Sequence, residues 1–284
     1  PMDIGVAADV VVCPNESGSY TVLKNRFGHS NYCVYPTVPI PEPQDLIPPM
    51  TNDEINASSS SLPIAATSEQ TARFMATVYA WMGAGVATSA ATAYLVAQSH
   101  DAHAALTTGA TGIYVVLAPF ALIVALGFLS YKQRPYLAAV LYAALTSLIG
   151  VMLSSIAVKA GSDAAFASDA VTSLVVSAGM FAGLAFVGWT TKRDLSGWGT
   201  FLAAALWGLI LAMVVNVFAG STLAGFLINA AAILLFSAMT AYDVQTAKRS
   251  AHLGMSAAVV CALSLYLDFL NLFTSILGLS HADD

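Results

Sequence analysis

Two apolar runs joined by a short basic turn decide the fold of this chain. From Thr222 to Leu279 the sequence reads TLAGFLINAAAILLFSAMTAYDVQTAKRSAHLGMSAAVVCALSLYLDFLNLFTSILGL. The runs cover 222–245 and 255–279, and each exceeds the ~20 apolar residues that a helix needs to cross a bilayer core. Because the turn holds Lys248 and Arg249, we expect an antiparallel helical hairpin whose turn lies in water.

Five further apolar runs precede this hairpin, with short polar breaks between them. They cover 74–97, 113–130, 136–158, 170–189 and 200–219. Backbone groups in lipid must be satisfied within their own segment, and the alternating pattern of a barrel strand is absent, so each run is expected to be a helix. The sequence therefore predicts an all-α membrane protein with a bundle of seven transmembrane helices. Because the last run contains Asp268 and Asn271, a re-entrant segment is the alternative for that run.

The composition of the whole chain agrees with this prediction. Of its 284 residues, 57% are hydrophobic and only 9% are charged, whereas about 25% of the residues of a soluble domain are charged. So few charges cannot cover so apolar a core in water, which excludes a soluble globular enzyme and a disordered chain. The net charge of −6 argues against nucleic acid as a partner.

Residues 1–66 differ from the rest of the chain. Nine of its 11 prolines lie between Pro1 and Pro63, and residues 58–61 are all serine. Proline fixes φ and removes a hydrogen-bond donor, so we expect a disordered, Pro- and Ser-rich cytosolic tail over 1–66. The transmembrane domain is then expected to cover 67–284, with the lipid bilayer as its first partner.

The basic residues set the expected orientation. If the N-terminal tail is cytosolic, nine of the ten Lys and Arg residues face the cytosol and only Lys159 faces outward. An excess of Lys and Arg in cytoplasmic loops is typical of membrane proteins. The sequence therefore predicts a cytosolic N-terminus.

Two acidic residues, Asp243 and Asp268, lie inside the last two apolar runs, where no Lys or Arg accompanies them. An ionised Asp at the centre of a membrane helix costs ~2.5–3.5 kcal/mol. The hairpin brings the two helices together, so we expect the carboxyls to meet and to share one proton, as a pH-sensitive latch. Fully deprotonated, the pair would suit a hard cation such as Ca²⁺. The alternative is that each Asp only hydrogen-bonds a neighbouring helix.

Asn271 is a candidate partner of this pair. It follows Asp268 by three residues and therefore lies on the same helix face. Interhelical hydrogen bonding is the simpler role for such an amide, and lining a cation path is the alternative.

Four ordered stretches resemble the transmembrane Bax-inhibitor-motif family. They are AYDVQ at 241–245, LSLYLDFLNLF at 263–273, VYAWM at 78–82 and TTKRDLSGWG at 190–199. The resemblance covers residues 74–279. It implies a seven-helix fold in which the seventh helix is central and surrounded by the others.

The resemblance also implies a function. The family is associated with a pH-sensitive calcium leak, in which the aspartates corresponding to Asp243 and Asp268 sense pH and gate the pore. Ca²⁺ and protons would then be the ligands, with Ca²⁺ as a permeant or bound ion at the pair and no cofactor. Some members place a basic residue at the end of the second span as a partner for the aspartates, and here Lys132 and Arg134 are the candidates.

The family offers an alternative function as well. Some members are described as modulators of a membrane-bound AAA protease or as suppressors of cell death, so a non-conducting membrane regulator that binds such a partner is the competing prediction. The bacterial style of the motifs favours the bacterial plasma (inner) membrane, with the endoplasmic reticulum as the alternative.

The chain is expected not to be an enzyme. An intramembrane aspartyl protease would carry Gly-x-Gly-Asp at its second aspartate, whereas Leu265, Tyr266 and Leu267 precede Asp268. Nothing in the sequence resembles a hydrolase triad, a P-loop, HExxH or a dinucleotide fingerprint.

Overall fold

The computed structural model describes residues 10–15, 18–23, 67–131 and 135–281, and it divides the chain into two units, 1–63 and 64–284. In the first unit β1 (Val10–Asn15) pairs antiparallel with β2 (Gly18–Leu23), with Val10 opposite Leu23. The run of three valines that opens β1 favours a strand. This β-hairpin was not predicted, since the whole of 1–66 was expected to be a disordered tail. The rest of that tail lies outside the described residues.

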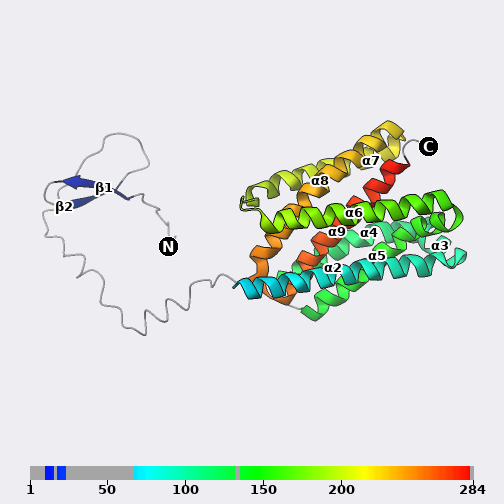
Figure 1. Ribbon diagram of the computed structural model, residues 1–284, viewed down its shortest axis with the longest axis horizontal. Helices are drawn as coiled ribbons and strands as arrows, with labels where there is room; N and C mark the ends of the chain where they lie inside the picture. The colour runs from blue at the N-terminus through cyan, green and yellow to red at the C-terminus, as the bar shows by residue number, and fades with distance from the viewer. Residues whose placement is uncertain (1–9, 16–17, 24–66, 132–134, 282–284) are drawn as a thin grey trace, which may run out of the picture. The chain divides into compact units, whose positions relative to one another are not determined.

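The second unit is a bundle of long helices (Figure 1). The long helices are α2 (Ser68–Ala97), α4 (Gly109–Tyr131), α5 (Pro135–Ser162), α6 (Ala164–Thr190), α7 (Gly199–Ala219), α8 (Thr222–Arg249) and α9 (Met255–Ser280). The short helix α3 (His100–Thr107) lies between α2 and α4, and the 3₁₀ turns η1 (Ser196–Trp198) and η2 (Ser250–Leu253) precede α7 and α9. Each apolar run of the sequence forms one long helix.

The ends of the helices extend beyond the apolar runs where polar residues cap them. The run predicted from residue 170 begins as α6 at Ala164, because Asp163 caps it. Its Oδ1 accepts hydrogen bonds from the backbone N–H groups of Ala165 at 2.9 Å and Phe166 at 3.2 Å. At the start of α2, Thr67 and Gln70 form a reciprocal capping box.

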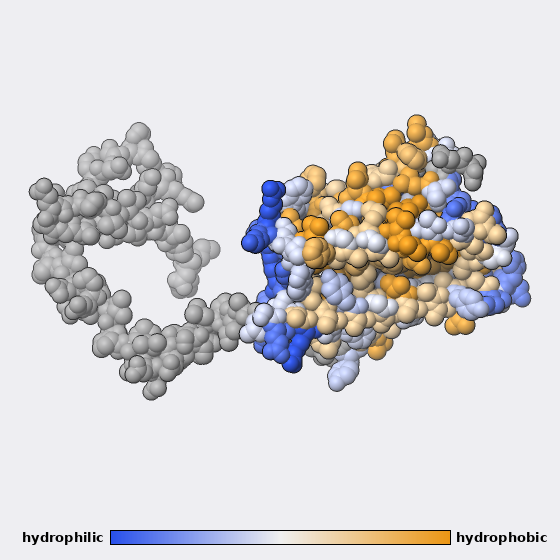
Figure 2. Space-filling model, viewed as in Figure 1, coloured by the Kyte–Doolittle hydropathy of each residue, from blue (hydrophilic) through white to orange (hydrophobic). Residues whose placement is uncertain are grey.

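Six helices in the described part of the chain, α4 to α9, are long and apolar enough to cross a membrane. α2 is the longest helix, with 30 residues, but it does not reach the same apolarity. On the face that Figure 2 shows, an apolar belt covers the middle of the bundle, and hydrophilic residues gather at its two ends. In water such a belt would cause aggregation, whereas a bilayer covers it. The chain is an integral membrane protein.

α9 is the most buried of the six apolar helices. In its most apolar window of 18 residues 56% are buried, against 39% in α5 and less in the other four. It packs against α2, α4, α5, α6 and α8. Because α9 runs unbroken from Met255 to Ser280, the re-entrant alternative for this run is wrong.

Two glycines allow helices of the bundle to approach closely. A Cβ on Gly85 of α2 would collide with the hydroxyl of Tyr142, which donates a hydrogen bond to the carbonyl oxygen of Trp81 at 3.0 Å. A Cβ on Gly188 of α6 would collide with the backbone carbonyl of Ala241 in α8. Such small residues at helix contacts are typical of membrane bundles. The second contact holds α8 against α6 two residues before Asp243.

Candidate functional site

The contacts between α8 and α9 set the level of each side chain along their interface, which we name the α8–α9 seam. Near one end, the side chain of Ser264 lies beside the Asp243 carboxylate. Near the other end, a Cβ on Gly278 would lie 2.6 Å from Asn229 Nδ2. Asn229 and Asp243 are fourteen residues apart on α8, and Ser264 and Gly278 are fourteen apart on α9. One antiparallel register therefore accounts for both contacts.

This register brings Asp243 and Asp268 onto the same seam but at different levels. Asp268 lies four residues beyond Ser264, so it is about 6 Å further along the helix axis than Asp243. Asp243 is half-buried and Asp268 is only 1% exposed. The two acids predicted from the sequence are thus neighbours that are staggered by one helical turn.

Asp268 is exceptional because one of its oxygens has no hydrogen-bond partner. Within the described ranges, Asp268 Oδ2 is a buried carboxylate oxygen that accepts no hydrogen bond, and Asn216 Oδ1 is a buried amide oxygen that accepts none. A buried polar atom left unpaired costs ~1–3 kcal/mol, and a charged one costs more. A proton or a cation at Asp268 would remove this cost.

A polar stripe runs along α9 on the face that carries Asp268. Ser264, Asp268, Asn271 and Ser275 follow one another at steps of four, three and four residues, which keeps them on one side of the helix. The Asn271 Nδ2 donates to the carbonyl oxygen of Leu267 at 2.8 Å. Asn271 therefore shares the face of Asp268 but bonds to the backbone of its own helix.

The remaining predicted partners of the pair, Lys132 and Arg134, lie outside the described residues. No group of three or more His, Cys, Asp or Glu that could hold a metal ion is found in the part of the chain that the structure describes. The seam instead offers carboxylate, hydroxyl and amide oxygens, which are the ligands that Ca²⁺ prefers. Ca²⁺ is coordinated by about six to eight oxygen ligands. Two carboxylates alone would therefore bind it weakly, with water molecules completing the coordination.

A second polar cluster, at the end of α8, was not predicted from the sequence. The Gln245 side chain is 8% exposed. Its Oε1 accepts from the backbone N–H of Leu195 at 2.8 Å and from Arg249 Nη2 at 2.7 Å, while its Nε2 donates to the carbonyl oxygen of Arg193 at 2.8 Å. We name Arg193, Asp194, Gln245 and Arg249 the loop clamp. The loop clamp joins two of the four family-like stretches, 190–199 and 241–245. The presence of both stretches was the one signal in the sequence from which this cluster could have been predicted.

Asp194 is the acid of the loop clamp and lies outside the candidate spans. Its Oδ1 accepts from the backbone N–H of Ser196 at 2.8 Å and from Arg249 Nη2 at 2.5 Å. These bonds, with the Ser196 backbone bond contributing most, lower the pKa of Asp194 to about 2. Asp194 is therefore an exposed carboxylate whose charge is satisfied by donors.

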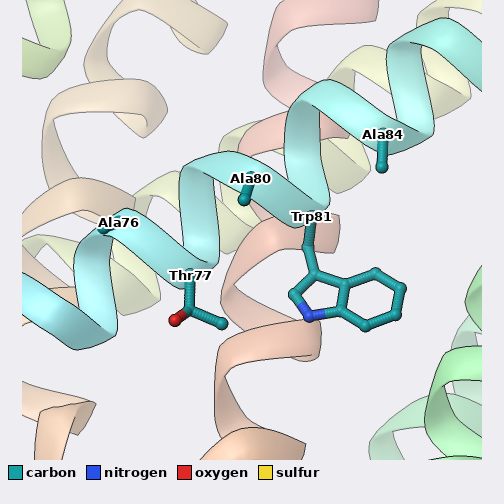
Figure 3. Close-up of a pocket in the computed structure, with 5 residues that line it drawn as sticks. All are labelled: Ala76, Thr77, Ala80, Trp81 and Ala84. Carbon is teal, nitrogen blue, oxygen red and sulfur yellow. The ribbon is translucent and has the colours of Figure 1, made fainter.

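An apolar hollow lies on the outward side of α2. It is lined by Ala76, Thr77, Ala80, Trp81 and Ala84, and Figure 3 shows the Trp81 ring projecting beside the short alanine side chains. A helix face made of small residues is where another membrane helix packs closely. This surface holds no titratable side chain, so it is separate in chemistry from the acids of the seam.

Comparison with known proteins identifies relatives of the helical unit. A family model described as "Inhibitor of apoptosis-promoting Bax1" matches residues 71–282. An uncharacterized protein of Deinococcus radiodurans is 35% identical over 224 residues, which is 77% of this chain and 94% of the relative. The inner membrane protein YbhL of Escherichia coli is 33% identical over 213 residues, covering 72% of this chain and 89% of its own. The resemblance drawn from the four stretches is confirmed.

Proposed function

This chain belongs to the family of inhibitors of apoptosis-promoting Bax1, and on that premise we propose that it is a pH-sensitive calcium leak channel gated by Asp243 and Asp268. The observation that carries the proposal is the buried Oδ2 of Asp268, which has no hydrogen-bond donor and lies one helical turn from a second acid on the neighbouring helix. An acid in this setting responds to protons and to cations.

The proposed gate works through the number of protons on the pair. Two ionised carboxylates on facing helices, staggered by one helical turn, repel each other more strongly inside the bundle than they would in water. One proton removes that repulsion, and a hard cation between the acids offsets it. The number of protons bound to the two acids therefore controls both the packing of α8 against α9 and the attraction of the pair for Ca²⁺. Membrane acids of this kind commonly mark ion or proton paths.

The proposal includes α2 as a seventh span, with α9 at the centre of the bundle. A helix of 30 residues is about 45 Å long, which exceeds the ~30 Å core of a bilayer. α2 also packs against both α5 and α9, two of the apolar helices. Its lower apolarity is consistent with an outward face of alanine rather than of large side chains.

The proposed orientation places the end of the bundle with the loop clamp in the cytosol. Arg73 lines a hollow with His252, Lys248 donates to the carbonyl oxygen of Trp189, and Arg249 pairs with Asp194, so these basic residues gather at one end. The positive-inside rule favours the cytosol for that end and for the chain that precedes α2. The name of the Escherichia coli relative supports a bacterial inner membrane. We propose no catalytic role for the protein.

The experiment that tests this function is Ca²⁺ flux into liposomes that contain the purified protein, with the pH varied stepwise. We expect wild-type flux to change with pH by roughly tenfold or more, as for a typical coupling of 1.4 kcal/mol or above. Asp268→Asn should remove the pH dependence, whereas Asp194→Asn, a matched change outside the seam, should keep it. Equal pH profiles for wild type and Asp268→Asn would contradict the proposal.

A second candidate function is a non-conducting regulator that binds a membrane-bound AAA protease or a cell-death partner. The observation that favours it is the small-residue hollow on α2, since such a face suits a helix of another membrane protein. The same liposomes distinguish the two functions. A regulator gives only background Ca²⁺ flux at every pH, and substitution of Asp268 then changes nothing.

A further inference from the structure

We propose that the contact between Asn229 and Gly278 is the constriction of the leak path at the end of the α8–α9 seam opposite to the acid pair. This inference rests on the proposed function and extends it to a second, neutral site. It assigns to Asn229 the control of how fast a cation leaves the seam, while Asp243 and Asp268 control the response to pH.

The side chain of Asn229 fills the space in front of Gly278. A Cβ on Gly278 would lie 2.6 Å from Nδ2, 3.0 Å from Cγ and 3.1 Å from Oδ1 of Asn229. All three nearest atoms belong to the same amide. The absence of a side chain at Gly278 is therefore what makes room for the amide of Asn229.

The contact between Asn229 and Gly278 lies on the polar stripe of α9. From Asp268 the stripe continues through Asn271 and Ser275 to Gly278, at steps of three, four and three residues. In the antiparallel register Asn271 is level with Phe236 of α8, and Ser275 is level with Ala232, both of them buried. Along this stretch the side-chain oxygens of the seam therefore come from α9. The next polar side chain that α8 contributes to the seam is that of Asn229.

A second amide, that of Asn216, belongs to the same end of the bundle as Asn229. Asn216 of α7 has a buried Oδ1 that accepts no hydrogen bond, and its Nδ2 lies 3.5 Å from where a Cβ of Gly225 would be. Gly225 precedes Asn229 by four residues, which is one turn of α8. Two amides from two helices therefore gather at this end. Amide carbonyl oxygens are ligands that Ca²⁺ accepts, so a cation that has passed the acids meets suitable oxygens here.

The contact between Asn229 and Gly278 is electrically neutral. Asn229, Gly278, Ser275 and Asn216 carry no titratable group. His281 and Asp169, which belong to the same end of α9 and to α6, pair with each other at 3.6 Å, and His281 also packs against Phe166 of α6. The constriction should therefore change the rate of flux without moving the pH at which flux changes.

The test measures Ca²⁺ flux against pH in liposomes for Gly278→Ala, Asn229→Ala and the double variant. Gly278→Ala should lower the flux by roughly tenfold, because the added methyl group leaves the amide no room. Asn229→Ala should raise the flux several-fold above wild type, and the double variant should return close to wild type since the new Cβ fills the space that the amide vacates. All three should keep the wild-type pH midpoint. Gly183→Ala is the control, because a Cβ there meets nothing within 4 Å.

The outcomes separate this inference from the function on which it rests. A wild-type protein without flux at any pH overturns the proposed function and this inference together. A pH-dependent wild type in which Asn229→Ala fails to raise the flux, or in which the double variant stays as slow as Gly278→Ala, overturns the inference alone. If Gly278→Ala does not give a monodisperse protein, Asn229→Ala and the double variant still decide.

Discussion

Two aspartates, Asp194 in the loop clamp and Asp268 in the α8–α9 seam, are accommodated in opposite ways. The Asp194 side chain is 68% exposed and accepts hydrogen bonds from the Ser196 backbone and from Arg249. Asp268 is 1% exposed, and its Oδ2 accepts none. The first acid stays charged over the whole physiological range, because its donors lower its pKa to about 2.

This difference separates a carboxyl group whose negative charge is fixed by its surroundings from one whose charge can change. Donors around Asp194 make its charge a part of the structure, whereas the missing donor at Asp268 leaves the acid dependent on a proton or a cation. Buried ionisable groups that lack partners are costly to the fold, so their presence points to a role other than stability.

The largest effect on stability is expected from removal of the unpaired acid. Asp268→Asn should raise the free energy of unfolding by roughly 2 kcal/mol near pH 8, or about 4–8 °C in the unfolding temperature, since an amide carries no charge to bury. The gain should shrink as the pH falls and Asp268 takes up a proton. Thermal unfolding in detergent at several pH values measures this effect. A loss of stability at pH 8 would show that Asp268 is a structural residue like Asp194.

The next effect concerns the helix contact between the two regions. Gly188→Ala should lower the free energy of unfolding by about 1–3 kcal/mol, because its Cβ would collide with the backbone carbonyl of Ala241, which cannot turn away. Gly183→Ala in the same helix meets nothing within 4 Å and should be neutral or slightly stabilising. Unfolding temperatures of the two variants, measured side by side, give the comparison. Equal values would mean that α6 and α8 do not pack as described.

Loss of the central amide of the loop clamp should have a smaller effect. Gln245→Ala leaves the Leu195 N–H and the Arg193 carbonyl oxygen without their partner, which costs about 1–2 kcal/mol where those groups are shielded from water. Hydrogen exchange in residues 191–198 should become faster, while exchange in the middle of α9 stays unchanged. Gln98→Ala, at an exposed helix end, is the matched control. Unaltered exchange in the loop would show that Gln245 does not hold it.

The smallest effect is expected at Asp194 itself. The pKa of Asp194 is lowered from 3.8 to about 2, so its contribution to stability is complete above pH 4 to 5 and is lost as the pH falls through about 2. Asp194→Asn should therefore lower the unfolding temperature slightly and by the same amount from pH 5 to pH 8, with a smaller effect in high salt. The difference from wild type should vanish toward pH 2. A difference that grows on acidification would contradict the sign of this shift.

Much of the helical unit could be predicted because apolar runs long enough to cross a bilayer have few alternatives to a helix. The hairpin of 222–279 also followed from the sequence, since a short basic turn between two such runs forces the helices to lie antiparallel. The presence of Asp243 and Asp268 on facing helices came from the same argument. Contact between the two carboxyls, with one shared proton, stays a prediction.

The stagger of the two acids could not be predicted. It depends on the register of α8 against α9, which the 3₁₀ turn η2 and the positive φ of 80° at Gly254 help to set and which the apolar pattern leaves open. The loop clamp was missed for another reason. Gln245 looks like an ordinary polar residue at a helix end, and its partners Arg193 and Leu195 lie about fifty residues away in the sequence.

The most direct test of the central claim is a double-mutant cycle in the pH dependence of Ca²⁺ flux, with Asp243→Asn, Asp268→Asn and the double variant in liposomes. If the two acids act as one gate, each single substitution removes the whole pH dependence and the double variant removes no more. If each single variant keeps part of the pH dependence and the two losses add up in the double variant, the acids act independently and the account of a gating pair is wrong.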